Sequence, residues 1–81
     1  MSMSTGILTS SDRAAMRALE LLEGEPGEPF TTVRAALIVE SELLPMTLDC
    51  SLYRLQRDGW IFREARPGHG TTITILRRLA A

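Results

Sequence analysis

The sequence predicts an α+β domain in which three helices precede a two-stranded β-hairpin. Apolar residues recur at helical spacing before Gly59, and residues that favour strands follow it. Breaks rich in glycine and proline separate these segments, so each segment is expected to form one element. The chain of 81 residues is long enough for one domain and too short for two. Residues 9–81 are assigned to this domain and residues 1–8 to a flexible leader.

The first helix is expected from about residue 11 to residue 23. Residues 9–12, Thr-Ser-Ser-Asp, are good N-cap residues, and Gly24 is expected to stop the helix in a left-handed conformation. The segment 25–29 contains two prolines, which exclude both a helix and a central strand. The apolar residues at helical spacing are Ala15, Met16, Leu19 and Leu22.

The second helix is expected from about residue 32 to residue 41, and it is apolar nearly all round. Phe30 ahead of Thr31-Thr32 is typical of a hydrophobic staple before an N-cap. Because only one side of this helix can face the other two helices, its remaining apolar residues are expected to form a covered patch. Either a second copy of the chain or Ile7-Leu8 folding back would cover it. The patch residues are Ala35, Ile38 and Val39.

The third helix begins near Pro45, whose missing amide proton costs nothing in a first turn, and ends at Gly59. Leu48, Leu52 and Leu55 form its inward stripe. At 100° per residue the opposite, outward face carries Met46, Cys50, Tyr53, Arg54 and Arg57.

After Gly59 the apolar residues no longer follow the helical spacing. Residues 60–64 and 71–76 are rich in aromatic and β-branched side chains and predict two strands. Residues 65–70 contain the proline and glycines of a hairpin tip. The last residues, 77–81, are too few for a separate element.

Charge is divided unevenly along the chain. Residues 1–50 carry a net charge of −5 and residues 51–81 a net charge of +4, although the whole chain has a net charge of −1. Every cation is an arginine, a residue suited to phosphates and to guanine edges. A fold that gathers the second half on one face would present a basic surface. Alternatively, the absence of lysine reflects only a GC-rich genome.

Composition argues against several classes of function. One cysteine and one histidine cannot form a disulfide framework or a zinc site, and no phosphate-binding loop or nucleophile motif is present. The sequence therefore predicts a protein that is not an enzyme and that needs no metal and no cofactor. No segment is long and apolar enough to span a membrane, and the N-terminus lacks the basic region of a secretory signal. A reducing, cytoplasmic location is expected.

Residues 52–61, Leu-Tyr-Arg-Leu-Gln-Arg-Asp-Gly-Trp-Ile, followed by a charged hairpin, resemble the end of the recognition helix and the start of the wing in winged helix-turn-helix proteins. The likeness is greatest to the multiple-antibiotic-resistance regulators and the PadR-type regulators, and it covers roughly residues 31–76. It implies a three-helix winged helix-turn-helix with a C-terminal two-stranded wing. Where the family often has a glycine or small residue between the second and third helices, this chain has Glu42-Leu43-Leu44-Pro45.

The resemblance also implies a partner and a site. A small bacterial or phage transcriptional regulator, or an accessory DNA-binding protein, would bind double-stranded DNA as a homodimer, with the third helix in the major groove and the wing on phosphates or in the minor groove. Arg54 would bond to guanine or phosphate, and Arg57 to the backbone. The DNA-contacting residues so implied are Met46, Thr47, Cys50, Tyr53, Arg54 and Arg57 on the helix, and Arg63, Arg66 and His69 on the wing.

The residues leave other interpretations open. Arg54 and Arg57 also suit a solvated helix face near its C-terminus, and Gly68-His69-Gly70 also suits a plain flexible turn. Asp49 would repel phosphates, although the helix dipole favours a carboxylate there. The acidic first half and the apolar second helix favour a different class, a winged helix that binds a protein instead of DNA. A subunit of an assembly and a phage-encoded inhibitor of a host protein both fit that class.

Overall fold

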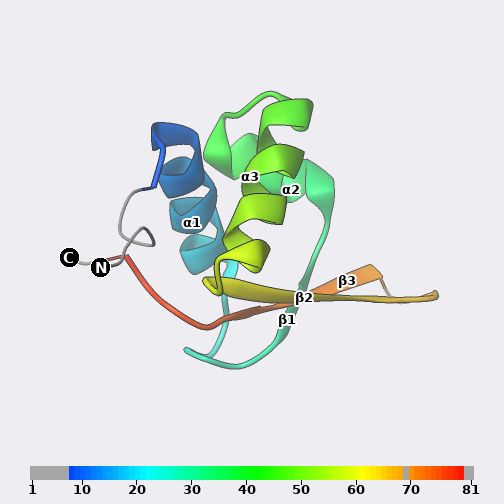
Figure 1. Ribbon diagram of the computed structural model, residues 1–81. Helices are drawn as coiled ribbons and strands as arrows, with labels where there is room; N and C mark the ends of the chain where they lie inside the picture. The colour runs from blue at the N-terminus through cyan, green and yellow to red at the C-terminus, as the bar shows by residue number, and fades with distance from the viewer. Residues whose placement is uncertain (1–7, 69, 80–81) are drawn as a thin grey trace.

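The computed structural model describes residues 8–68 and 70–79 and confirms an α+β architecture. Three helices lie on one side of a small antiparallel sheet (Figure 1). Along the chain the elements are α1 (Ser10–Leu22), β1 (Phe30–Thr32), α2 (Arg34–Ser41), α3 (Pro45–Arg57), β2 (Ile61–Arg66) and β3 (Gly70–Ile75).

The sheet has three strands in the order β1-β3-β2, whereas the sequence predicted two. The missed strand is β1, in which Phe30 pairs with Ile73 and Thr32 with Thr71. Its three residues carry too little local pattern to show a strand, because their partners lie about 40 residues further along the chain. The predicted staple and N-cap are therefore wrong, and α2 begins after Val33, which makes no side-chain cap.

At the ends of α1 and α3, one detail differs from the prediction. Thr9 and Asp12 form a capping box at the start of α1, as a cluster of N-cap residues allows. At the other end Glu23 caps α1 in an extended conformation, so Gly24 is not the left-handed stop that was predicted. After α3, by contrast, Gly59 does adopt a left-handed backbone with φ of 83°. In the described part of the chain, no helix is long and apolar enough to cross a membrane.

The turn between α2 and α3 contains a strained residue. Glu42 has φ of 60° and ψ of 22°, and it is the one residue other than glycine with positive φ among those described. Its amide donates to the carbonyl oxygen of Ile38, which closes α2, and the next amide, that of Leu43, donates to Ser41 Oγ. Pro45 then occupies the first turn of α3, as predicted.

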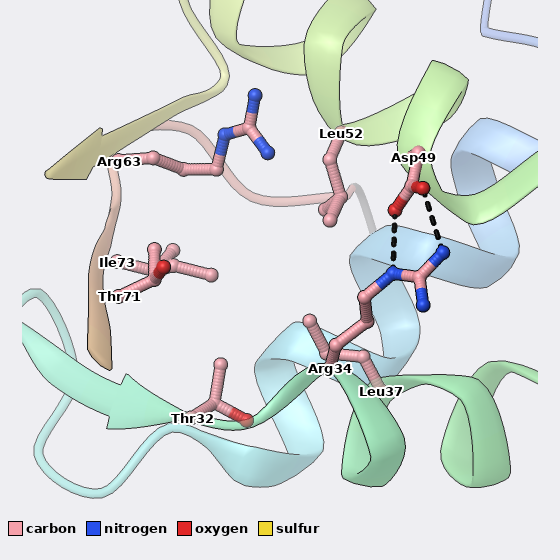
Figure 2. Close-up of a pocket in the computed structure, with 8 residues that line it drawn as sticks. All are labelled: Thr32, Arg34, Leu37, Asp49, Leu52, Arg63, Thr71 and Ile73. Atoms are coloured by element: carbon pink, nitrogen blue, oxygen red, sulfur yellow. Dashed lines mark hydrogen bonds and ion pairs between the residues drawn. The ribbon is translucent and has the colours of Figure 1, made fainter. Parts of the chain in front are cut away.

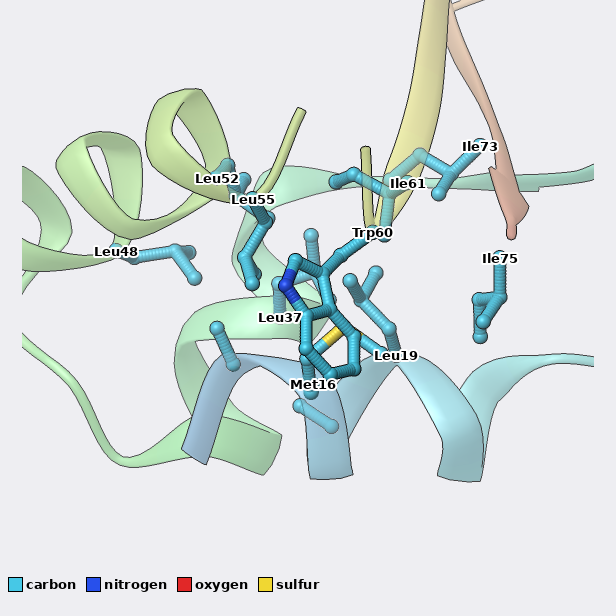
Figure 3. Packing of buried hydrophobic residues seen from close by; sticks show 12 residues of the cluster. Met16, Leu19, Leu37, Leu48, Leu52, Leu55, Trp60, Ile61, Ile73 and Ile75 are labelled. Atoms are coloured by element: carbon cyan, nitrogen blue, oxygen red, sulfur yellow. The ribbon is translucent and has the colours of Figure 1, made fainter. Parts of the chain in front are cut away.

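The core lies between the helices and the inner face of the sheet (Figure 3). Met16 and Leu19 of α1 meet Leu55 of α3, with Ile61 of β2 beside them, and all four are at most 1% exposed. Leu8, which the sequence assigned to the leader, is partly buried against this core. The rest of that leader, residues 1–7, lies outside the described residues.

Candidate functional site

The predicted outward face of α3 is exposed in the structure. Met46 and Tyr53 are 77% and 62% exposed, and Cys50 between them is exposed as well. Thr47, at the edge of this face, is half-buried. The middle of the face is therefore uncharged.

Arg54 does not extend freely into solvent. Its Nη2 lies 2.8 Å from Asp12 Oδ1 of α1 and also donates to Ser51 Oγ at 3.3 Å. Asp12 is only 4% exposed. Burial by itself raises the pKa of Asp12, but hydrogen bonds from Arg54, Ser51 and the Thr9 amide outweigh burial and hold that pKa below its ordinary value. Arg54 thus ties α3 to the start of α1.

The other arginine of this face, Arg57, is paired with Asp58, the next residue, at 3.0 Å. Near the C-terminus, Arg78 pairs with Glu23, and Arg77 stacks 4.2 Å above the ring centre of Trp60. Arg54, Arg57 and Arg78 of residues 51–81 are therefore each paired with a carboxylate. This pairing lowers the positive charge that the sequence expected on that half of the molecule.

The hairpin of β2 and β3 extends beyond the helices (Figure 1). Arg63 donates its Nε to Gln56 Oε1 of α3 at 2.9 Å. Arg66 is the last residue of β2, in register with Gly70. Gly68 and Gly70 have positive φ of 79° and 78°, which the turn requires. His69 lies outside the described residues.

A hollow of about 120 Å³ lies between α3, the start of α2 and the inner face of the sheet (Figure 2). Arg34 of α2 forms a two-point pair with Asp49 of α3, with Nε–Oδ1 and Nη2–Oδ2 distances of 3.0 and 2.8 Å. Hydrogen bonds from Arg34 lower the pKa of Asp49, and the charge of Arg63 adds to the lowering. The sequence did not indicate this hollow, because its walls come from five elements. The lining residues are Thr32, Arg34, Leu37, Asp49, Leu52, Arg63, Thr71 and Ile73.

The three residues of the predicted α2 patch differ in exposure. Val39 is 72% exposed and Ala35 is exposed, whereas Ile38 is half-buried and packs against the core. Leu8 packs on the core without covering Val39. Ile7, the other residue of the predicted cover, lies outside the described residues.

Comparisons with protein-family models, with curated proteins and with solved structures gave no match to this chain. In the described part of the chain, no group of three or more histidine, cysteine, aspartate or glutamate residues is placed to hold a metal ion.

Proposed function

We propose that this chain is a small winged helix-turn-helix protein that binds double-stranded DNA as a homodimer. It would act as a transcriptional regulator or accessory DNA-binding factor of a bacterial or phage type. One observation carries the proposal: the third helix has an exposed outward face and is followed directly by a hairpin that extends beyond the helical layer (Figure 1). In such an arrangement α3 enters the major groove and the β2–β3 hairpin contacts the adjacent backbone or minor groove.

The α3 residues proposed to meet DNA differ in the contact that each would make. Thr47 and Tyr53 on α3, with Met46 and Cys50, present hydroxyl and apolar groups to base edges. Arg57 lies at the end of the same face and is exposed, so its exposed pair with Asp58 can exchange for a phosphate. Arg54 is proposed to hold α3 in position through Asp12 and to contact DNA only if that pair opens.

The test measures binding to random-sequence duplex DNA by fluorescence anisotropy at a series of salt concentrations. Released counterions should make the affinity fall steeply with salt. A plot of the logarithm of the binding constant against the logarithm of the salt concentration gives a slope that reflects the number of phosphate contacts. Arg57→Gln should make this slope shallower by about 0.9, the value for one phosphate contact. Arg17→Gln, which removes the same charge from an exposed position on α1, is the matched control and should leave the slope unchanged. An affinity for DNA that does not depend on salt would contradict the proposal.

A second candidate is a protein-binding module, and the uncharged centre of the α3 face favours it. Met46 and Tyr53 expose apolar surface, and both arginines of α3 are paired with carboxylates. Met46→Arg separates the candidates, because a new cation on this face strengthens DNA binding and weakens docking of an apolar partner. Leu21→Arg, at a 72% exposed position on α1, controls for the change in net charge. A protein captured in stoichiometric amount by the wild type but not by Met46→Arg, without DNA affinity, would favour the second candidate.

A further inference from the structure

Two arginines from different elements line the hollow beside α3. Arg34 comes from the first turn of α2 and Arg63 from the middle of β2, and the hydroxyl-bearing Thr32 and Thr71 lie on the same wall (Figure 2). The hollow is partly open, and its volume of about 120 Å³ leaves room for several water molecules or one tetrahedral oxyanion. Arginine guanidinium groups and hydroxyls are the side chains that bind phosphate oxygens.

The carboxylate of Asp49 already takes part in this arrangement. It accepts two hydrogen bonds from Arg34 and lies within the electrostatic range of Arg63. Arg63 donates its Nε to the neutral Gln56. A carboxylate held at two points by one guanidinium, with a second guanidinium nearby, occupies the place that an external oxyanion would take.

The pair of Arg34 with Asp49 is well suited to exchange. The side chains of Arg34 and Asp49 are 55% and 51% exposed, so water already screens their attraction. An exposed pair of this kind contributes little to stability, and an incoming anion can replace its carboxylate without unfolding the chain.

The start of α2 adds positive potential at the same place. Val33, the N-cap residue, makes no side-chain cap bond, so the first amides of α2 have no capping acceptor from it. Thr32 and Arg34, on either side of Val33, both line the hollow. The positive end of the helix dipole therefore lies beside the two arginines.

We propose that this hollow is a phosphate site formed by Arg34 and Arg63, and that Asp49 is its internal competitor. The phosphate belongs either to the DNA backbone or to a small phosphate ion, because both present the same oxygens. The DNA source rests on the function proposed above. Asp49 thereby weakens non-specific binding of DNA, since a phosphate that enters the hollow must first displace the Asp49 carboxylate from Arg34.

The first experiment uses inorganic phosphate as the probe at constant ionic strength. The full chain and its Asp49→Asn and Glu40→Gln variants are titrated, and the arginine Nε–H resonances are followed by NMR. Glu40→Gln is the matched control, because it removes one negative charge from an exposed position of α2 that does not line the hollow. Circular dichroism melting checks that each variant is folded.

In Asp49→Asn, the Arg34 and Arg63 resonances should shift on phosphate addition with a dissociation constant at least roughly threefold below that of the wild type. Glu40→Gln should behave as the wild type. Equal responses of the two variants, or shifts confined to other arginines, would overturn the proposal.

The second experiment measures duplex DNA binding by the same variants. Asp49→Asn should bind more tightly and show a salt slope steeper by about 0.9, and adding Arg34→Gln to it should remove the gain. If phosphate binds as expected but no variant binds DNA, the site stands and the proposed function fails. If the wild type binds DNA but Asp49→Asn matches Glu40→Gln in both experiments, the phosphate site fails and the proposed function stands.

Discussion

Asp12 links the first helix to the third at the scale of a single residue. Its carboxylate accepts the Thr9 amide within the capping box of α1 and pairs with Arg54 of α3. A carboxylate that is only 4% exposed depends on these partners, because an unpaired buried charge is strongly unfavourable. The main role of Arg54 is therefore structural, because it neutralises Asp12 and joins α3 to α1.

Arg54→Met should lower the free energy of unfolding by about 2 kcal/mol, since it leaves the Asp12 carboxylate without its charged donor. Arg57→Met is the matched control and should change stability little, because the pair with Asp58 is exposed. Urea unfolding of both variants at pH 7 measures the difference. Equal stability of the two would show that the Asp12–Arg54 pair contributes nothing beyond a surface pair.

The same pair predicts how stability depends on pH. The folded pKa of Asp12 lies below the value of 3.8 for a free aspartate, so the unfolded chain binds a proton more readily than the folded chain does. The stabilisation is present above the unfolded pKa and disappears as pH falls through the folded pKa.

Wild-type protein should therefore lose stability as pH is lowered below about 4, and Asp12→Asn should lose less over the same range. Urea unfolding at a series of pH values from neutral to acid gives both slopes. Glu23 and Asp49, whose pKa values are also lowered, contribute to the slope of both proteins and cancel in the comparison. Parallel curves would contradict the role assigned to Asp12.

At the scale of an element, the turn between α2 and α3 places a residue other than glycine in a left-handed backbone conformation. Glu42 adopts the left-handed conformation that costs a residue with a Cβ atom roughly 1 kcal/mol. The surrounding bonds, from the Glu42 amide to Ile38 and from the Leu43 amide to Ser41, hold it there. Glycine in this turn, which the resemblance leads one to expect, would avoid that cost.

Glu42→Gly should therefore raise the free energy of unfolding by up to about 1 kcal/mol. Glu40→Gly, the same substitution two residues earlier and inside α2, should lower it by about 1 kcal/mol. Thermal unfolding of the two variants under the same conditions measures both changes in stability, which should have opposite signs. Destabilisation by both changes would show that the turn gains nothing from glycine.

At the scale of the whole molecule, one side of α2 packs against the core and another side is exposed, where a partner could bind. Ile38 packs against the core, whereas Val39 exposes 72% of its surface in the single chain. Under the proposed homodimer, Val39 and Ala35 are covered by the second copy.

Val39→Glu should accordingly give a folded monomer with weakened DNA binding, as measured by light scattering and anisotropy. Ile38→Glu should instead lower the free energy of unfolding by about 2 kcal/mol, because it places a charge against the core. An unchanged molecular mass for Val39→Glu, together with an unchanged DNA affinity, would remove this face of α2 from the proposal.

The sequence determined the helices, the hairpin and the core. Apolar spacing of 3.6 residues marks the inward faces of α1 and α3, and the change of pattern at Gly59 marks the start of the strands. These features depend on neighbours a few residues apart, so local sequence is sufficient to predict them.

The tertiary structure decided the third strand and the distribution of charge. β1 exists because β3 pairs with it from about 40 residues away. Charge was decided in the same way, since Asp12 reaches Arg54 and Glu23 reaches Arg78 across the fold. The acidic first half and the basic second half thus neutralise each other in part. A count of charges along the chain cannot show this, because ion pairs depend on distance in space and not on distance in sequence.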